Sequence, residues 1–571
     1  MIESCRQTDI SYIFQSSLDR NAANPHLLVD LARCALLECV QSSLVEGKMI
    51  ELGHAPRRST GFFVILASFI ALDLLSWPIF FSYYLFVFAD RSNFLNLDYL
   101  LDQHLRLGVD TYYQYGLIPV FLQHVLFSLF GGGYWPLIGC TIAVLILMAM
   151  FWARIVWWVS NRWLSIVAVI AISPLLLIVN PNLPYSLVQL SMLFALLFLV
   201  EGRSDIALAV AAVGTFCVPS LPLLLTGLLA IYVVAEWWIN SERSISLLAR
   251  KLAPGVLTYV LLVVGLSLFF GVRSVLATAL PLLGTKVYYG EGKFDYDDLI
   301  TFLHPRGHSS LYYVGYYVVT PATWWMLSTV GLVILAVFAL MAMIRRGRVD
   351  PKYAAVIICA IVQIFFAVFA YRGDGQHTIY DPITAAGMLL GLWLVPAPRW
   401  RSSLLILFTL IGVGAQAAQA RQTLWAWQNT HRSAVTANLY AEPEYAPQLA
   451  HILKIAETQK VLMMSNATGV HHYYPSLRSA DTWFLVDTQM FPADHARVLA
   501  NIRDADVVVE DTAHVPYFTD RDPEIQSQLR SMCLTEVTRD FQIWWRHPPS
   551  SVECKINQRK TASILSATAK K

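Results

Sequence analysis

The stretch LNLDYLLDQHLRLGVDTYYQYGLIPVFLQHVLFSLFGGG, residues 95–133, decides how this chain is interpreted. It follows the first hydrophobic segment and gathers three carboxylates, Asp98, Asp102 and Asp110, within one short loop. A Tyr-Gly pair and a short amphipathic run come next. A very apolar chain has little reason to place three carboxylates directly after a membrane span unless they bind a ligand or take part in chemistry. Function is therefore expected in this loop.

The composition predicts a polytopic α-helical membrane protein. Hydrophobic residues make up 56% of the 571 and charged residues only 14%, whereas soluble domains carry roughly a quarter charged residues. The net charge of +2 gives no reason to expect nucleic acid as a partner. Because a span needs about 20 apolar residues, the apolar runs are too many for one globular core. We expect eleven spans, near 61–83, 137–159, 163–180, 184–200, 206–219, 221–238, 253–275, 321–344, 353–371, 380–396 and 403–419, with 206–238 alternatively forming one bent helix.

Basic residues predict the orientation, because Lys and Arg favour cytoplasmic loops. Arg57 and Arg58 precede the first span, so the N-terminus is expected in the cytoplasm. Alternation holds only if 116–131, a 16-residue segment that includes Gln123 and His124, lies in the interface instead of crossing the membrane. The acidic loop and the C-terminus then fall outside, in a bacterial inner (cell) membrane. The later basic loops fall inside: 241–251, 345–348 and 398–403.

Three regions are predicted along the chain. Residues 1–58 form a cytoplasmic extension, 59–420 the transmembrane domain with an external catalytic loop at 84–136, and 421–571 an external soluble α/β domain. In the last region, helical patterns alternate with strand patterns. It has neither a Gly-rich phosphate loop nor metal-ligand spacing, so we interpret it as a lid or acceptor-binding domain. The helical patterns cover 446–458, 493–503 and 523–531, and the strand patterns begin near Lys460 and Asp504, with 541–547 as an edge strand or hairpin.

Two cysteines, Cys533 and Cys554, lie in the C-terminal region. An oxidising compartment would permit a disulfide between them. Two cysteines also fall in one region by chance, so the sequence leaves the bond open.

The spacing of the carboxylates suggests a reactive cluster. Asp98 and Asp102 are four residues apart and share one face of a helix, and Asp110 can fold back after Gly108 ends that helix. Clustered carboxylates raise one another's pKa, which suits a general base or a divalent metal site. Asp98 and Asp102 are the expected ligands if a metal is bound. An ordinary solvated loop is the alternative interpretation.

The order of residues in this loop resembles the first external loop of the GT-C superfamily: an acidic residue, a helical stretch, Gly-x-Asp, an aromatic pair, Tyr-Gly and an amphipathic run. These membrane glycosyltransferases use polyprenyl-phosphate-linked sugars and include bacterial enzymes similar to protein O-mannosyltransferases. The resemblance implies that Asp98 is the catalytic base and Asp110 the second acidic residue. Two residues depart from the pattern, Tyr99 where a second acid is common and Leu117 where proline is usual.

A second external loop, YRGDGQH at 371–377, is similar to an Arg-x-Asp-x-x-His loop in GT-C-like proteins. Arg372 and His377 are expected to bind the donor phosphate, because guanidinium forks match phosphate oxygens. His304 and Arg306, in the long loop 283–320, are further candidates for this role.

These observations predict a glycosyltransferase of the inverting GT-C type that moves a hexose or pentose from a polyprenyl-phosphate donor to a lipid, glycan or protein acceptor at the outer face. A surface-polysaccharide polymerase or ligase would share the lipid-phosphate chemistry. A lipid or solute transporter is the other alternative, and it would carry charged residues deep in several spans.

Overall fold

The computed structural model describes residues 89–159 and 183–279 with short gaps, 321–365, 382–394 and, again with gaps, 424–550 together with Cys554. Contacts divide the chain into two units, Met1–Ser59 and Thr60–Lys571. Every element described below belongs to the second unit. Apart from isolated positions, three expected spans lie outside the described residues, namely 61–83, 163–180 and 403–419.

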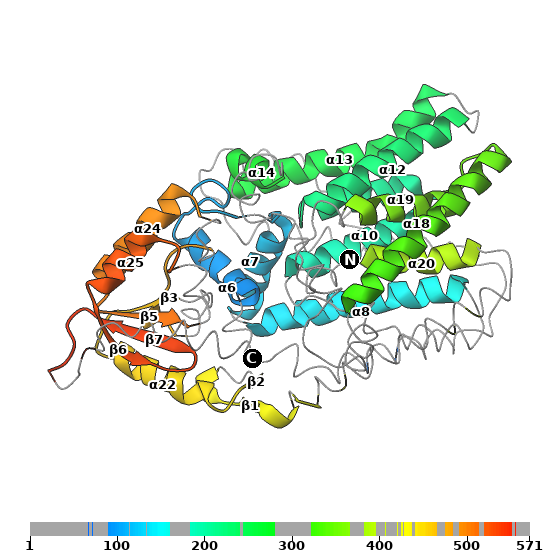
Figure 1. Ribbon diagram of the computed structural model, residues 1–571. Helices are drawn as coiled ribbons and strands as arrows, with labels where there is room; N and C mark the ends of the chain where they lie inside the picture. The colour runs from blue at the N-terminus through cyan, green and yellow to red at the C-terminus, as the bar shows by residue number, and fades with distance from the viewer. Residues whose placement is uncertain are drawn as a thin grey trace, which may run out of the picture. The chain divides into compact units, whose positions relative to one another are not determined.

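The apolar part of the second unit is helical (Figure 1). Its core consists mainly of leucine, valine and alanine side chains, among them the fully buried Leu196, Ala211 and Leu229. Helix α10 packs against α8, α11 and α19, and α11 packs against α12 and α13. The helices are α6 (Ala89–Asp102), α7 (Ile118–Phe130), α8 (Tyr134–Val159), α10 (Leu183–Val200), α11 (Ser204–Thr215), α12 (Ser220–Ile239), α13 (Ile245–Phe270), α14 (Val272–Ala279), α18 (Pro321–Arg346), α19 (Pro351–Phe365) and α20 (Pro382–Leu394).

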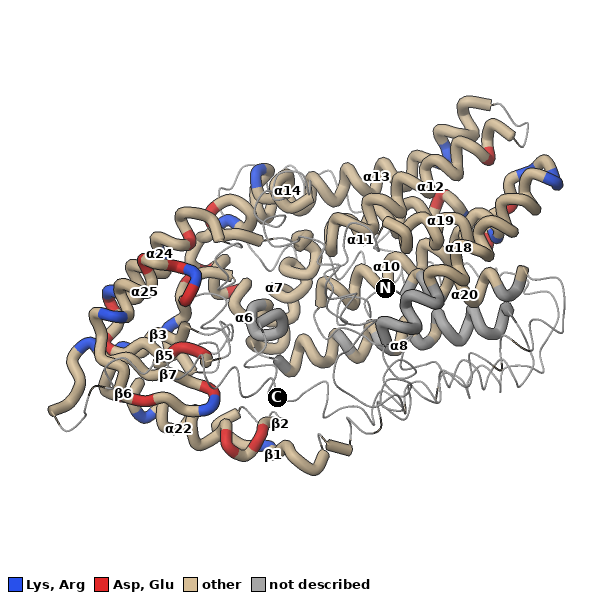
Figure 2. Tube along the Cα trace, in the orientation of Figure 1, with Lys and Arg blue, Asp and Glu red and all other residues tan. Residues whose placement is uncertain are grey.

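The chain is an integral membrane protein. Four of its described helices are long and apolar enough to cross a bilayer: Leu183–Val200, Ser220–Ile239, Ile245–Phe270 and Thr329–Arg346. Segments 206–219 and 221–238 correspond to two helices, α11 and α12, and not to one bent helix. Figure 2 shows that α12, α13 and α18 carry few charged residues along most of their length. The total of eleven spans stays a prediction.

Helix α7 differs from the spans in length and direction. It has 13 residues, which is roughly 20 Å of helix, whereas the hydrocarbon core is about 30 Å thick. Gly131 ends it with φ 80°, and the axis bends by 117° between α7 and α8. Helix α7 is thus too short to cross the membrane by itself, and the interfacial position of 116–131 stays a prediction.

The C-terminal region contains a five-stranded sheet in the order β4-β3-β5-β7-β6. Strand β3 pairs in parallel with β4 and β5, and β7 pairs antiparallel with β5 and β6. The predicted alternation of helices and strands is present. The segment 541–547 forms β7, which makes a hairpin with β6. Strand β7 lies inside the sheet, and β6 forms its edge. The strands are β3 (Val461–Met464), β4 (Leu477–Arg478), β5 (Val507–Asp511), β6 (Cys533–Val537) and β7 (Phe541–Trp545).

Helices cover both faces of this sheet (Figure 1). On β5, Val507 and Val509 pack in the cluster of α22 (Tyr445–Ala456). Val508, pointing the other way, packs with α24 (Pro492–Asp504) and α25 (Pro523–Arg530). Because both faces are covered, all four residues of β3 are buried.

Candidate active site

Asp98 lies in the last turns of α6, beside an apolar face that fixes the helix. Leu97 and Leu100 on that face are fully buried, whereas the Asp98 side chain remains 20% exposed. The carboxylate thus stands at the edge of the packed core and is partly open to solvent. The helix predicted for the carboxylate pair is confirmed, but it ends at Asp102 and not at Gly108, which lies in the loop with φ 75°.

His124 of α7 is the partner of Asp98. Its Nδ1 lies 2.7 Å from Asp98 Oδ1, and the imidazole is 32% exposed. The hydrogen bond to Asp98 raises the pKa of His124 above its ordinary value, while partial burial opposes the rise. Helices α6 and α7 together therefore present a carboxylate–imidazole pair.

Asp102 follows one turn after Asp98. Burial and then the charge of Asp98 raise the pKa of Asp102, and His124 and His104 lower it. Two neighbouring carboxylates suit a hard cation. In the described part of the chain, however, no three His, Cys, Asp or Glu side chains are placed to hold a metal together. A metal bound by Asp98 and Asp102 would need further ligands from elsewhere.

Asp110 is held by a different partner. Arg106 Nε and Nη2 donate to its two carboxylate oxygens at 2.8 Å each, and the Arg106 backbone N–H donates at 3.0 Å. The hydrogen bond from Arg106 lowers the pKa of Asp110. Among the described residues, no hydrogen bond or ion pair connects Asp110 with Asp98. The structure therefore brings Asp98 together with His124 and ties Asp110 into its own turn.

The Tyr-Gly pair of the motif anchors the loop to the connection between α11 and α12. Gly116 N–H donates to Cys217 O at 2.9 Å, and Ile118 N–H donates to Phe216 O at 3.0 Å. A Cβ on Gly116 would lie 1.9 Å from Phe216 O. Only glycine allows the two backbones to approach this closely.

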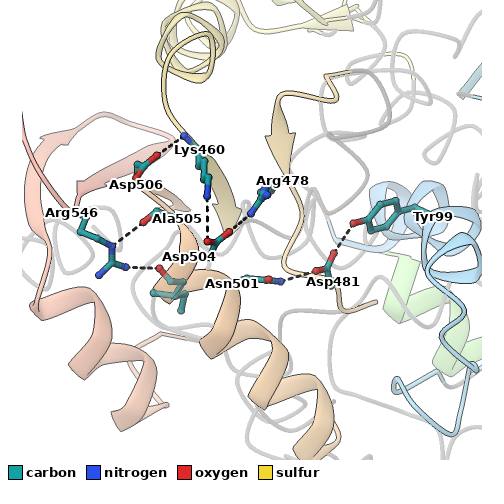
Figure 3. A network of polar contacts seen from close by, with 10 residues as sticks. Tyr99, Lys460, Arg478, Asp481, Asn501, Asp504, Ala505, Asp506 and Arg546 are labelled. Atoms are coloured by element: carbon teal, nitrogen blue, oxygen red, sulfur yellow. Dashed lines mark hydrogen bonds and ion pairs between the residues drawn. The ribbon is translucent and has the colours of Figure 1, made fainter.

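The C-terminal region meets the acidic loop directly. Asn96 Nδ2 donates to Thr482 O at 2.9 Å, and the Tyr99 hydroxyl donates to Asp481 Oδ1 at 2.9 Å. Figure 3 shows that Asp481 also lies beside Asn501. The buried ring of Trp483 stands 5.1 Å from Tyr113, centroid to centroid. One residue before Asp98 and one residue after it, Asn96 and Tyr99, are thus hydrogen-bonded to residues 481–482, almost 400 positions later in the chain.

The four predicted phosphate-binding residues Arg372, His377, Arg306 and His304 lie outside the described residues. Their role stays a prediction. The sequence did not predict the pairing of His124 with Asp98. The signal that could have found it is a titratable residue, His124, within the otherwise apolar helix α7. The sequence also missed Asp481 and Trp483, whose contacts no local pattern signals.

Solved structures resemble the chain in part. The Archaeoglobus fulgidus oligosaccharyltransferase, in a complex with Zn and sulfate, aligns over 85% of this chain and 73% of its own, with 11% identity and a TM-score of 0.47. ArnT from Cupriavidus metallidurans aligns over 86% of this chain and 98% of its own in the apo state, with 16% identity and a TM-score of 0.40. The structure of ArnT bound to undecaprenyl phosphate aligns over 85% of this chain and 98% of its own, with 14% identity and a TM-score of 0.42.

The first neighbour is named as an oligosaccharyltransferase, and the second is seen with undecaprenyl phosphate bound. No sequence family and no curated protein sequence matches the chain. Because TM-scores below 0.5 describe loose superpositions, the role of each residue rests on the contacts of this chain alone.

Proposed function

We propose that this protein is a membrane glycosyltransferase that moves a sugar from a polyprenyl-phosphate donor to an acceptor on the extracytoplasmic face. The observation that carries the proposal is the Asp98–His124 pair, held at 2.7 Å where α6 and α7 meet. A partly exposed carboxylate beside an interfacial helix is well placed to meet both a lipid-borne donor and a water-borne acceptor.

The proposed reaction is a single displacement with inversion. Asp98 accepts the proton of the acceptor hydroxyl, whose oxygen forms a bond to the anomeric carbon of the sugar. The bond from that carbon to the phosphate oxygen breaks, and its electron pair leaves with the polyprenyl phosphate. Arg372 and His377, with Arg306 and His304, are proposed to stabilise the leaving phosphate. His124 orients Asp98, and the sugar is a hexose or a pentose.

The disulfide supports the outer face as the site of reaction. Cys533 and Cys554 are bonded, and such bonds persist in oxidising compartments. The region that contains Cys533 also supplies Asp481, which is bonded to Tyr99 next to Asp98. The acidic loop therefore shares a compartment with the disulfide. The periplasm of a bacterium fits this arrangement, with the N-terminus in the cytoplasm.

The placement of charges favours an enzyme over a transporter. A transporter is expected to carry charged residues near the middle of several spans. In the described helices α10, α12, α13 and α18, the charged residues occupy only the first or last two turns, and α10 has none. The acceptor, whether lipid, glycan or protein, stays open, and a surface-polysaccharide polymerase or ligase uses the same donor chemistry.

The decisive experiment compares Asp98→Asn with Asp102→Asn in purified protein. Both variants remove one carboxylate charge from the same helix face at nearly constant volume. Transfer is measured with undecaprenyl phosphate carrying glucose, mannose or arabinose, and a lipid, glycan or peptide acceptor. Asp98→Asn should lower the rate on the order of a hundredfold or more, and Asp102→Asn should lower it much less. Full activity of Asp98→Asn would refute the assignment of the base.

Donor binding supplies a second arm of the experiment. Arg372→Lys should weaken binding of undecaprenyl phosphate because lysine cannot replace a bidentate guanidinium, and Arg372→Ala should weaken it further. Equal affinity of wild type and both variants would remove Arg372 from the donor site. If Asp98 and Asp102 hold a metal, EDTA should abolish transfer activity, and addition of Mg²⁺ or Mn²⁺ should restore that activity.

A further inference from the structure

Asp494 is a carboxylate with no exposed surface, and two of its three bonds close a turn of α24. Its Oδ2 accepts from the backbone N–H of Phe491 at 2.9 Å, which caps the helix, and its Oδ1 pairs with Arg497 one turn later. The third donor comes from the acidic loop, since the backbone N–H of Tyr112 donates to Oδ2 at 2.9 Å. The carboxylate thus joins α24 to the loop through a main-chain atom.

Arg497 extends this connection in two directions. Its Nη2 donates to the carbonyl oxygen of Asp110 at 3.0 Å, and its Nε donates to the carbonyl oxygen of Asp481 at 3.2 Å. One guanidinium therefore holds the Asp110 end of the loop and also the segment that binds Tyr99. A lysine could not make both contacts, because it lacks the planar fork.

Asp481 fixes the other end of the loop. Its Oδ1 accepts from the Tyr99 hydroxyl and its Oδ2 accepts from Asn501 Nδ2, each at 2.9 Å (Figure 3). Because Asn501 belongs to α24, the same helix reaches both ends of the segment that follows Asp98: residue 99 at its start and residues 110–112 at its end.

The far end of α24 is anchored to the sheet. Asp504 receives ion pairs from Lys460 and Arg478, and Arg546 donates to the carbonyl oxygens of Ile502 and Ala505 at 2.7 and 3.0 Å (Figure 3). The two bonds from Arg546 to the backbone hold this end of α24 on the sheet, and the Asp504 ion pairs, which are exposed, add little to them.

We propose that Asp494, Arg497 and Asp481 are positioning residues that hold the acidic loop, and with it Asp98, in the geometry needed for transfer. The inference rests on the proposed function and adds a role for the C-terminal region. Burying a carboxylate costs free energy that apolar packing would not. Each of the three residues makes one hydrogen bond to the loop: Asp494 to Tyr112, Arg497 to Asp110 and Asp481 to Tyr99. Directional bonds of this kind fix the geometry of the loop, which apolar packing alone does not specify.

The test compares Asp494→Ala with Asp504→Ala. Both substitutions remove a carboxylate of α24 that is paired with an arginine. Only Asp494 contacts the loop, through Tyr112. The ion pairs of Asp504 are exposed and lie beside the sheet. Hydrogen exchange is measured on peptides covering 107–115. Asp494→Ala should speed exchange there roughly tenfold or more, and Asp504→Ala should leave it unchanged.

The same two variants are compared for binding of undecaprenyl phosphate and for sugar transfer. Asp494→Ala should bind the lipid phosphate like wild type but transfer about 10- to 100-fold more slowly, because misplacing a catalytic group by an ångström costs that much. If Asp494→Ala does not fold, Arg497→Lys replaces it, since this variant keeps the charge and loses the fork.

The outcomes separate the positioning role from the proposed function. Unchanged exchange at 107–115 in Asp494→Ala, or faster exchange with full transfer, overturns the positioning role. If wild type transfers no sugar, the proposed function fails. In that case the exchange comparison still decides whether Asp494 holds the loop.

Discussion

Replacing Gly116 with alanine tests whether the acidic loop must lie directly against the connection between α11 and α12. The added Cβ would stand 1.9 Å from Phe216 O, 2.1 Å from Phe216 C and 2.8 Å from Cys217 N. All three are backbone atoms, so no side chain can rotate away to relieve the overlap. The loop would have to move by more than an ångström, carrying Tyr115 and the start of α7 with it.

That displacement breaks two backbone hydrogen bonds, from Gly116 to Cys217 and from Ile118 to Phe216. Each is worth about 1 kcal/mol, and overpacking a fixed site adds about 1–3 kcal/mol. Gly116→Ala should therefore lose about 3–5 kcal/mol of stability. It should also lose transfer activity, because α7 carries His124.

The assay is thermal unfolding of purified protein in detergent, followed by sugar transfer at a temperature where both proteins are folded. Gly265→Ala is the matched control. Gly265 lies within α13 and has open space where its Cβ would be, and alanine favours a helix over glycine. If Gly116→Ala proves as stable and as active as Gly265→Ala, the close approach seen for Gly116 does not constrain the loop.

Two further predictions concern stability. Reducing the Cys533–Cys554 disulfide, or replacing both cysteines with serine, should destabilise the C-terminal sheet by about 3 kcal/mol, because the bond spans 21 residues; tryptophan fluorescence in denaturant measures the change, and an unaltered midpoint would contradict it. Asp110→Asn should lower stability slightly at pH 7. Since Arg106 lowers the pKa of Asp110, this contribution is present above about pH 3.9, the ordinary aspartate value, and disappears as the pH falls through the lower folded pKa. A difference between wild type and Asp110→Asn that stays constant down to pH 3 would contradict the ion pair.

The sequence predicted elements whose signals are local. Periodicity located α24 and β5 to within a few residues, and the interfacial position of 116–131 stays a prediction. Strand β6 (Cys533–Val537) was not predicted, because its exposed and buried residues do not alternate cleanly. The disulfide could not be decided from two cysteines, since the bond depends on β6 lying near residue 554.

The carboxylates show where local reasoning stops. The spacing of Asp98 and Asp102 placed both on one helix face, as found, because helical geometry fixes residues four apart. Asp110 was expected to fold back toward them, yet Arg106 lies four residues before it and captures the carboxylate at 2.8 Å. A near partner of opposite charge costs less chain entropy than a distant cluster of like charge. His124, 26 positions after Asp98, needed the packing of α6 on α7.

The contacts of Asp494 and Asp481 bear on the predicted boundary near residue 420. The bond from Tyr112 to Asp494 joins residues 382 positions apart, so no pattern within either segment announces it. Without the C-terminal region, Tyr112 would lose its acceptor, and the aromatic rings around Trp483 would be open to water. An unpaired buried donor costs about 1–3 kcal/mol. The unit that holds Asp98 in place therefore extends across the predicted boundary near 420 to α24.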